Sequence, residues 1–299
     1  MPVSDTQPEF LTTHEVAALL RVKERKVYDL ASAGDIPCRR VTGKLLFPRV
    51  EIEAWISGGA TTSSVPFPSK LPPSLVAGSH DPLLDWALRE SASGLATLYD
   101  GSLDGLDRIF AGEAVASGLH IFEPGSGNWN VDHVSELMGG SPYVLIEFAK
   151  RQQGLIVTPK AVGAIKSIKD LKGRTIIHRQ PTAGARLLFE HLLADAGLDH
   201  HTVTAISAIA RTEADAAEIV ASGKADATLG IEAMALQYHL GFIPLIEERF
   251  DLLVNRRACF EAPLQALFAF CRTTTFADKA KSMGGYNLAT HGNVHWNGG

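Results

Sequence analysis

Apolar residues recur at helical spacing near the beginning of the chain. In "LTTHEVAALL", Val16, Leu19 and Leu20 fall on one face of a predicted helix. Thr12 precedes this pattern and Glu15 follows three residues later, the capping-box spacing in which each side chain satisfies a free backbone amide of the other residue. We expect the helix to begin directly after Thr12.

A second helical pattern follows after a short connection. "RVKERKVYDLASAG" places Val22 in the turn, directs Val27, Leu30 and Ala31 inward, and supplies Gly34 as a C-cap. Because the connection has only a few residues, the two helices must cross at a steep angle, which is the helix-turn-helix arrangement.

The pattern then changes to short strands. "RRV" and "KLLF" flank Thr42-Gly43, which predicts a tight hairpin. Pro48 is suited to begin a third helix, because its missing N–H costs nothing in the first turn. The apolar side chains expected to close this small core are those of Val50, Ile52 and Trp55–Ile56.

Residues 57–75, "SGGATTSSVPFPSKLPPSL", are rich in Gly, Ser, Thr and Pro and nearly uncharged. Such a segment buries too little apolar area to fold, and its prolines favour extended conformations. We therefore predict an N-terminal domain at residues 1–57, a linker at 58–73 and a C-terminal domain at 74–299.

The C-terminal domain alternates short apolar runs with helical patterns, as in "RTIIHRQPTAGARLLFEHLLADAG". That alternation indicates βα units, mainly parallel sheets and an α/β fold. Ligands of such sheets bind at the carboxyl ends of the strands, where the helices begin.

Charge is unevenly distributed along the chain. The whole sequence has 28 basic and 33 acidic residues, a net charge of −5, yet residues 21–49 hold eight basic and three acidic side chains. The overall balance therefore does not exclude a local polyanion site. The basic charge lies on the second predicted helix and the hairpin.

Composition limits the class of protein. Hydrophobic residues make up 45% and charged residues 20%, which permits large cores in two domains. We find no secretory signal and no run of ~20 apolar residues for a membrane span. The cysteines, Cys38, Cys259 and Cys271, are odd in number without metal-ligand spacing. We expect reduced thiols, a cytoplasmic protein and no membrane partner.

Residues 10–56 in this order resemble the winged helix-turn-helix of the excisionase and MerR-like DNA-binding group. The resemblance implies that the second helix enters the major groove. Base readout is then expected from Lys23, Glu24, Arg25 and Tyr28, and phosphate contact from Lys26, Arg39, Arg40 and Lys44, with Thr42 of the hairpin turn beside them. For an isolated helix, a solvated charged face is the alternative; the hairpin cations favour DNA.

Three predicted strand-to-helix turns place small hydroxyl residues where free amides and the helix dipole favour an anion. They are "AGSHDP", "YDGSLDG" and "HRQPTAGAR", and "DATLGIE" is a fourth candidate segment. The alternative is that each hydroxyl is an ordinary N-cap. The ligand-binding candidates are Ser79, His80, Asp81, Ser102, Arg179, Gln180, Thr182, Gly184, Arg186, Gly230 and Glu232.

Residues 74–299 resemble the type II periplasmic-binding-protein fold, in particular the domain found fused to DNA-binding modules and to molybdopterin-biosynthesis proteins. "SHDPLLDWAL", "RQQGLIV", "IKDLKGRTI", "ASGKADATLGIEA" and "GGYNLATHGNVHWN" carry the likeness. It implies two lobes around a ligand cleft: residues 75–143 with the C-terminal tail, and residues 152–243, joined by hinge strands near 143–150 and 244–254. Gly184-Ala185-Arg186 departs from the Gly-Thr-Arg of relatives and weakens any inference of oxyanion selectivity.

Two arginines near the expected cleft have alternative roles. An arginine there binds an anion bidentately or pairs with a neighbouring carboxylate. For Arg151 the possible partners are Glu147, Glu247 and Glu248, and both roles stay open; for Arg179 we favour the ligand.

No pattern in the sequence indicates catalysis, a metal site or a cofactor. Ser79-His80-Asp81 has the residue types of a hydrolytic triad, but contiguous residues cannot form the relay through space. His200-His201 cannot face one metal comfortably, and His291 and His295 lack a supporting Cys or carboxylate cluster. We expect a binding protein without a cofactor.

Two functions remain. The first is a transcription regulator that binds a double-stranded DNA operator as a homodimer and senses a small solute. By resemblance the solute is an oxyanion such as molybdate or tungstate, with a small organic acid as the alternative. The second is a cytosolic solute-binding or molybdenum-cofactor-related protein whose N-terminal domain is a protein-interaction adaptor.

Overall fold

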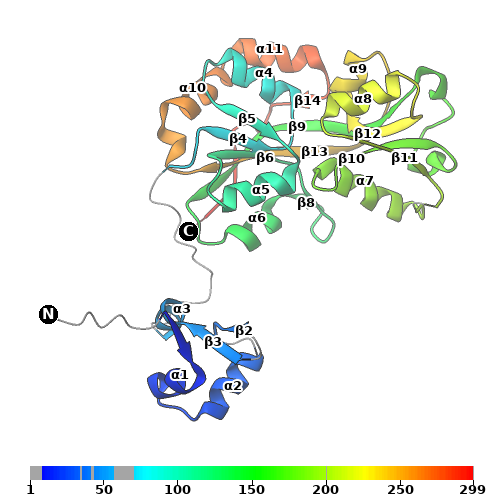
Figure 1. Cartoon of the computed structure of the whole chain (residues 1–299). Coiled ribbons are helices and arrows are strands. Elements are labelled where there is room, and N and C mark those ends of the chain that lie inside the picture. The colour runs from blue at the N-terminus through cyan, green and yellow to red at the C-terminus, as the bar shows by residue number, and fades with distance from the viewer. Residues whose placement is uncertain (1–8, 34–35, 42–43, 57–70, 200, 299) are drawn as a thin grey trace. The chain divides into compact units, whose positions relative to one another are not determined.

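The computed structural model describes residues 9–33, 36–41, 44–56, 71–199 and 201–298. The chain forms two compact units, residues 1–65 and 66–299 (Figure 1). Each unit is described by itself below.

The N-terminal unit is a small winged helix-turn-helix built on a three-stranded antiparallel sheet in the order β1-β3-β2. Thr12 caps the first helix as predicted: its Oγ1 accepts a hydrogen bond from the Glu15 amide at 3.3 Å, and the Glu15 carboxylate accepts one from the Thr12 amide at 2.7 Å. The elements are β1 (Phe10–Thr12), α1 (Thr13–Leu20), α2 (Glu24–Ala33), β2 (Arg39–Val41), β3 (Lys44–Pro48) and α3 (Arg49–Ile56).

The core of this unit corrects three of the predicted inward positions, Leu19, Val50 and Ile56. The buried face of α1 follows Thr13, Val16 and Ala17, one turn apart, so Leu19 points outward and is 46% exposed. In α3, Ile52 is fully buried, whereas Val50, two residues earlier and therefore on the opposite side, is 77% exposed.

Other expectations for this unit are met where the structure describes the residues. Val27 is buried, and Leu30, Ala31 and Trp55 pack against the same core, whereas Ile56 is 45% exposed. Strands β2 and β3 pair as the hairpin requires. The predicted C-cap Gly34 and the hairpin turn Thr42-Gly43 lie outside the described residues.

The C-terminal unit has two α/β lobes on one curled sheet, in the strand order β11-β10-β12-β9-β13-β6-β4-β5. Parallel strands β4, β5 and β6 form the first lobe, and parallel strands β10, β11 and β12 the second. Figure 1 shows helices on both faces of each group of strands, for example α8 and α9 on one face of the second lobe and α7 on the other.

The elements of the first lobe and its neighbours are β4 (Leu75–Gly78), α4 (Pro82–Glu90), β5 (Ala96–Tyr99), α5 (Ser102–Phe110), β6 (Ala116–Leu119), β7 (Phe122–Glu123), β8 (Asn128–Trp129) and α6 (Val131–Met138). Those of the second lobe are the short helices η1 (Pro159–Ala161) and η2 (Ile168–Leu171), then β10 (Thr175–Arg179), α7 (Gly184–Asp195), β11 (Thr204–Ala210), α8 (Glu213–Ala221), β12 (Ala227–Ile231) and α9 (Glu232–Gln237). The tail adds η3 (Ala258–Phe260), α10 (Ala262–Phe270), α11 (Thr274–Met283), β14 (Tyr286–Asn287) and β15 (Val294–Asn297).

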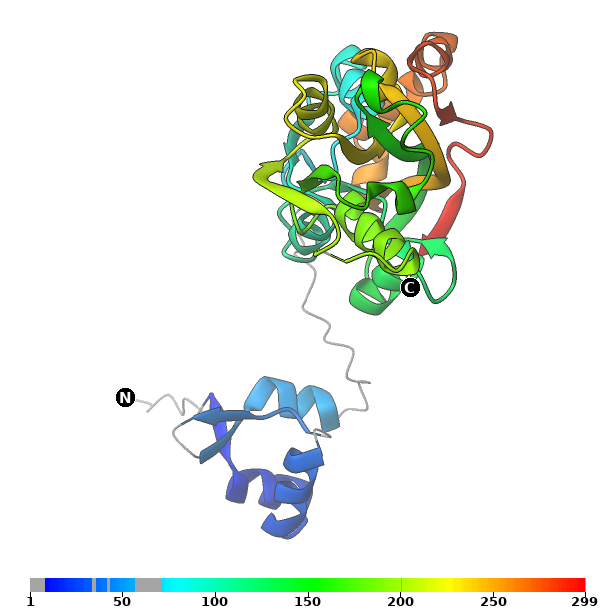
Figure 2. The same ribbon diagram turned by 90° about the vertical axis from the view of Figure 1, so that its right-hand side faces the viewer.

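Two long strands connect the lobes. β9 (Tyr143–Val157) and β13 (Gly241–Asn255) pair antiparallel over most of their length, and both extend beyond the predicted hinge segments. In the second lobe β9 also pairs with β12, and in the first lobe β13 also pairs with β6. The C-terminal segment, red in Figure 2, returns along β9 through β14 and β15.

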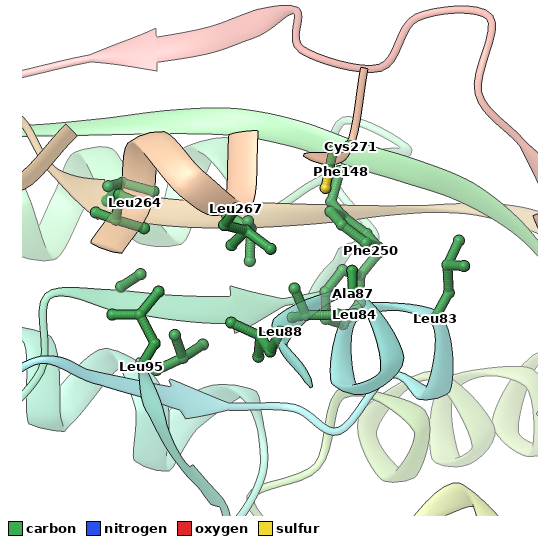
Figure 3. Packing of buried hydrophobic residues seen from close by; sticks show 14 of the residues in the cluster. Leu83, Leu84, Ala87, Leu88, Leu95, Phe148, Phe250, Leu264, Leu267 and Cys271 are labelled. Carbon is green, nitrogen blue, oxygen red and sulfur yellow. The ribbon is translucent and has the colours of Figure 1, made fainter. Parts of the chain in front are cut away.

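The largest apolar cluster fixes the first lobe to these crossing strands. Figure 3 shows Leu83, Leu84, Ala87 and Leu88 of α4 gathered with Leu264 and Leu267 of α10 near Phe148 and Phe250. Phe148 lies on β9 and Phe250 on β13, and their rings meet edge to face with centroids 6.1 Å apart. The loop at the amino end of α4 is thereby held rigidly beside the two hinge strands.

The different burial of Ile52 and Val50 in α3 predicts different effects of replacing each with alanine. Ile52→Ala removes fully buried methyl groups and should lower the free energy of unfolding of this unit by about 2–4 kcal/mol. Val50→Ala, at the exposed position of the same helix, should change it by less than about 0.5 kcal/mol. Amide hydrogen exchange of the N-terminal unit in the full-length protein measures both; equal losses would contradict the burial described for α3.

Candidate functional site

The predicted DNA-contacting face of α2 is exposed. Lys23, Arg25, Lys26 and Tyr28 all reach the surface, and Tyr28 is 49% exposed. Val27 lies among them and is fully buried, so it anchors the helix while its neighbours face outward. Two cationic side chains and one aromatic ring on α2, with Lys23 directly before the helix, form a surface suited to a nucleic-acid groove.

Two other predicted DNA contacts are engaged within the unit. The Glu24 carboxylate lies 2.9 Å from His14 Nδ1, and Arg39 Nη2 donates to Glu51 at 2.7 Å. Lys44 is exposed. Arg40 lies on β2 and Thr42 in the hairpin turn, but the Arg40 side chain and all of Thr42 are outside the described residues.

In the first lobe, the turn after β4 holds the most connected of the predicted ligand residues. Asp81 caps α4 through Oδ1, which accepts from the Leu84 amide at 2.7 Å. Its Oδ2 accepts from Arg151 Nη1 and from the Tyr286 hydroxyl, each at 2.8 Å. Asp81 and Arg151 are both essentially inaccessible to solvent. One carboxylate therefore joins a helix start, a crossing strand and the C-terminal tail.

Arg151 also forms an ion pair with Glu248, its partner on the other crossing strand. Burial alone would lower the pKa of Arg151, but Glu248 and then Asp81 outweigh it, and the net shift is upward. Burial would raise the pKa of Glu248, but Arg151 and His120 outweigh it, and that pKa falls. Both residues are therefore charged in the folded protein.

Three further side chains complete this cluster. His120 Nδ1 lies 2.9 Å from Glu248 Oε2, and Gln153 Nε2 donates to Glu248 Oε1 at 3.1 Å. The guanidinium of Arg151 lies over the Phe250 ring, 4.3 Å from its centroid. Of the roles left open for Arg151, pairing with Glu248 is the one observed.

Two predicted hydroxyls of the first lobe contact each other. Ser79 Oγ and Ser102 Oγ are 2.8 Å apart, and Ser102 Oγ accepts from the His120 amide at 3.2 Å. Neither hydroxyl caps its helix through a side-chain bond; Asp81 caps α4, and α5 begins after Gly101 without a side-chain cap. The N-cap alternative therefore does not describe these serines.

In the second lobe, Arg179 at the end of β10 pairs with Glu213 at the start of α8, with Nη1 and Oε1 2.5 Å apart. Arg179 Nη2 and Gln180 Nε2 both donate to the Arg211 carbonyl, at 3.0 and 3.2 Å. Arg179 and Glu213 are buried. The predicted anion ligand Arg179 thus already has a carboxylate partner.

The two lobes are in contact around these residues. The Leu103 amide donates to the Thr182 carbonyl at 3.0 Å, and Thr182 Oγ1 donates to the Asp100 carbonyl at 2.7 Å. Arg211 of the second lobe pairs with Asp100 at 3.1 Å. At Gly101, which has a φ of +100°, a Cβ would lie 2.7 Å from the Thr182 carbonyl carbon, so a glycine is required for this approach.

Several polar atoms from the two lobes and from β9 have no hydrogen-bond partner among the described residues. Six of these atoms are His80 Nδ1, Arg151 Nε, Gln153 Oε1, Arg179 Nε, Gln180 Oε1 and Glu213 Oε2. We call these six residues, with Asp81 and Glu248, the interlobe site. Leaving so many buried polar atoms unpaired is costly, and in native proteins it marks a place where a ligand or water binds.

Electrostatic effects connect the members of this site. Burial lowers the pKa of His80, while Asp81 and Glu213 act in the opposite direction. Glu213 also contributes to raising the pKa of Arg151. Glu213 of the second lobe is therefore within electrostatic reach of groups on the first lobe and on the hinge.

Three of the predicted ligand residues take other places. Arg186 donates to Glu190 at 2.5 Å and lines a separate pocket with His178. Glu232 lies against Gly285. At Gly184 a Cβ would lie 2.4 Å from the His120 carbonyl oxygen, so its role is to let α7 approach the first lobe. Gly230 does border the site, because a Cβ there would lie 3.2 Å from Glu213 Oε2.

The most important members not predicted from sequence are Gln153 and Glu213, whereas Glu248 was expected only as one of three possible partners of Arg151. Glu213 was hidden in an ordinary capping pattern, "TEAD", in which Thr212 and Asp215 form the capping box. Gln153 and Glu248 lie inside strands whose pairing brings them into the site. A polar residue inside an otherwise apolar strand was the available signal.

Among the residues that the structure describes, no cluster of three or more His, Cys, Asp or Glu side chains is arranged to hold a metal ion. Within the same described ranges, no helix combines the length and apolar character needed to cross a membrane.

Comparison with known proteins agrees with this architecture. A family model for the PBP superfamily domain matches residues 86–272, and one for a helix-turn-helix domain matches residues 10–60. YvgK of Bacillus subtilis (strain 168), an uncharacterized protein, is 28% identical and covers 95% of this chain and 96% of its own length.

Two other similarities are more limited. An uncharacterized protein encoded in the 5′ region of the ferredoxin 2Fe-2S gene of Clostridium pasteurianum is 29% identical over 36% of this chain and 96% of its own length. The crystal structure of an assigned phosphate ABC transporter substrate-binding protein from Clostridium perfringens, with bound phosphate, covers 70% of this chain and 96% of its own at 12% identity. Its TM-score of 0.50 supports a shared fold.

The buried ion network predicts a large difference between two arginines. Arg151→Met leaves Asp81 and Glu248 buried without their cation and should lower the free energy of unfolding of the C-terminal unit by about 3–5 kcal/mol. Arg186→Met breaks only a partly exposed pair on α7 and should cost less than about 1 kcal/mol. Urea titration followed by circular dichroism compares the two variants. A similar loss of unfolding free energy for both would contradict the proposed contribution of the ion network.

Proposed function

The chain belongs to the PBP superfamily over residues 86–272, and we propose that it is a transcription regulator whose interlobe site binds a small solute and thereby changes the affinity of its helix-turn-helix domain for DNA. The observation that carries the proposal is the set of unpartnered buried polar atoms contributed by both lobes and the hinge. A protein with the DNA-binding domain alone would not need such a site.

The exposed cations of α2 support the DNA-binding half of the proposal. Lys23 and Arg25 with Tyr28 are suited to base readout, and Lys26 and Lys44 to phosphate contact. Arg39 would have to exchange Glu51 for a phosphate, and Glu24 would have to leave His14, so we rank both below the other candidates. We propose that the protein binds a double-stranded operator in the cytoplasm as a homodimer, because helix-turn-helix proteins commonly read two half-sites.

The solute-binding half rests on contacts between the lobes. Hydrogen bonds between Leu103 and Thr182 and the ion pair between Arg211 and Asp100 hold the lobes together around the site. A solute bound there contacts residues of both lobes and stabilises this arrangement over an open one. Solute and DNA are then coupled only as far as the solute prefers one DNA-binding state. Both domains bind, and we propose no catalytic step for either.

The chemical class of the solute can be inferred from the charges and hydrogen-bond donors of the interlobe site. An oxyanion such as molybdate or tungstate needs surplus hydrogen-bond donors or positive charge, but Arg151 and Arg179 are each already paired with a carboxylate. The departure at Ala185 removes a hydroxyl donor, and Thr182 Oγ1 is used by Asp100. The same pairing also disfavours a bare carboxylate, so of the two solutes considered we favour the small organic acid in a form that also carries a hydrogen-bond donor.

DNA binding is tested first. From a random DNA library, the full-length protein should select a preferred sequence, with affinity that falls steeply as salt rises. Arg25→Ala should lower the preference for the selected over a scrambled sequence by about 1–3 kcal/mol, whereas Lys44→Ala should weaken both alike and reduce the salt slope by about one. Lys224→Ala, an exposed lysine of the C-terminal unit, is the matched control. If no salt-dependent binding occurs, the adaptor function is favoured instead.

Coupling is tested next. A solute that binds the free protein should change the DNA dissociation constant, and saturating DNA should change the solute dissociation constant by the same factor. Fluorescence anisotropy of labelled operator with and without solute, and calorimetry with and without operator, give the two factors. A solute that binds tightly yet leaves the DNA affinity unchanged would contradict the regulator function while leaving the DNA-binding domain intact.

A further inference from the structure

The charges of the interlobe site do not suit a simple anion. Three carboxylates, Asp81, Glu213 and Glu248, face two guanidiniums, Arg151 and Arg179. The carboxylates therefore exceed the guanidiniums by one charge, and His120 is hydrogen-bonded to one of them, Glu248. All three carboxylates are buried, so bulk water does not screen them effectively. An incoming anion would find no uncompensated positive charge.

The unpartnered atoms include both hydrogen-bond donors and acceptors. Arg151 Nε and Arg179 Nε are N–H donors. Gln153 Oε1, Gln180 Oε1 and Glu213 Oε2 are acceptors, and the Glu213 oxygen is part of a carboxylate. A solute that carries only oxygen acceptors can bind the two arginine N–H donors. It leaves the three acceptor oxygens buried and without a partner.

Glu213 has the position required of an acceptor for a cation. Its Oε1 pairs with Arg179, while Oε2 has no hydrogen-bond partner among the described residues and would lie 3.2 Å from a Cβ at Gly230. The side chain is 1% exposed. Its charge acts on the pKa values of both His80 and Arg151, so it lies within electrostatic reach of these two members of the site.

From this arrangement we propose that the effector is a zwitterionic organic solute, with a carboxylate and an ammonium group. The carboxylate accepts from the unpartnered Nε–H groups of Arg151 and Arg179, and the ammonium donates to Glu213 Oε2 and to Gln180 Oε1. The solute adds no net charge, so the balance of the buried site is preserved. The proposal rests on the proposed solute-sensing function and deepens it by naming the solute class.

The first test changes the solute and uses the unaltered full-length protein. Calorimetry measures binding of each of the common L-amino acids, of their desamino carboxylates, and of molybdate, tungstate and phosphate. At least one amino acid should bind, and replacing its ammonium by hydrogen should weaken binding about 10- to 100-fold, because a charge-assisted hydrogen bond in a buried site is lost.

Two outcomes would overturn the zwitterion proposal. One is that molybdate, tungstate, phosphate or a desamino carboxylate binds as tightly as any amino acid; the other is that no amino acid binds. If a bound oxyanion also shifts the DNA affinity, the solute class is wrong but the regulator function stands. If an amino acid binds without any effect on DNA, the solute class stands and the regulator function fails.

The second test changes the protein. Glu213→Gln keeps the shape of the side chain but removes its charge, and should weaken binding of the amino acid about 10- to 100-fold while changing binding of its desamino analogue less than about threefold. Glu190→Gln alters a carboxylate that pairs with Arg186 outside the interlobe site and is the matched control. Equal losses for amino acid and desamino analogue in Glu213→Gln would contradict an ammonium contact.

A folding check and a second variant distinguish loss of the ammonium contact from misfolding. Because Glu213 pairs with buried Arg179, Glu213→Gln is checked by its thermal midpoint before binding is compared. Gln180→Met retains the length of the side chain and the Arg179–Glu213 pair but removes a carbonyl acceptor. This substitution should weaken binding of the amino acid more than binding of its desamino analogue. A larger loss of affinity for the desamino analogue would contradict the assigned position of the ammonium.

Discussion

The buried ion network of Asp81, Arg151 and Glu248 is the constraint on which the C-terminal unit depends. It joins the start of α4, both crossing strands and, through Tyr286, the C-terminal tail. Charges removed from water are tolerated only in the presence of their partners, so each member fixes the others. The same network occupies the carboxyl end of β4, where an α/β sheet binds ligands, and it therefore sets the charge that any solute meets.

Because of this network, one part of the interlobe site is fixed in place, while polar atoms in the other part have no hydrogen-bond partner among the described residues. Asp81 uses both oxygens on the protein, whereas Glu213 and Gln153 each keep one oxygen without a partner among the described residues. The rigid half belongs to the first lobe and the crossing strands, and Glu213 comes from the second lobe. A solute that bridges the two halves adds contacts that exist only when the lobes are together, as a sensor needs in order to distinguish two states.

Local features of the chain were predictable from sequence, and long-range ones were much less so. The Thr12–Glu15 capping box, the inward Val27 and the alternation of strands and helices depend on neighbours in sequence. Leu19 and Val50 were misplaced because an apolar residue next to a buried face does not reveal on which side of the helix it falls. Glu213 was missed because its partner Arg179 lies 34 residues away. Glu248 could not be singled out among the three possible partners of Arg151 because it lies on a different strand. Arg186 pairs with Glu190 four residues further along α7, a local helical pair that competes with the predicted role as a ligand.

The position of a bound solute tests the central claim most directly. A crystal structure of the full-length protein with its tightest-binding small solute should place that solute between Arg151 of the hinge and Glu213 of the second lobe, in contact with residues of both lobes. A solute bound to one lobe only, or in the separate pocket lined by His178 and Arg186, would contradict the assignment of the interlobe site as the sensor.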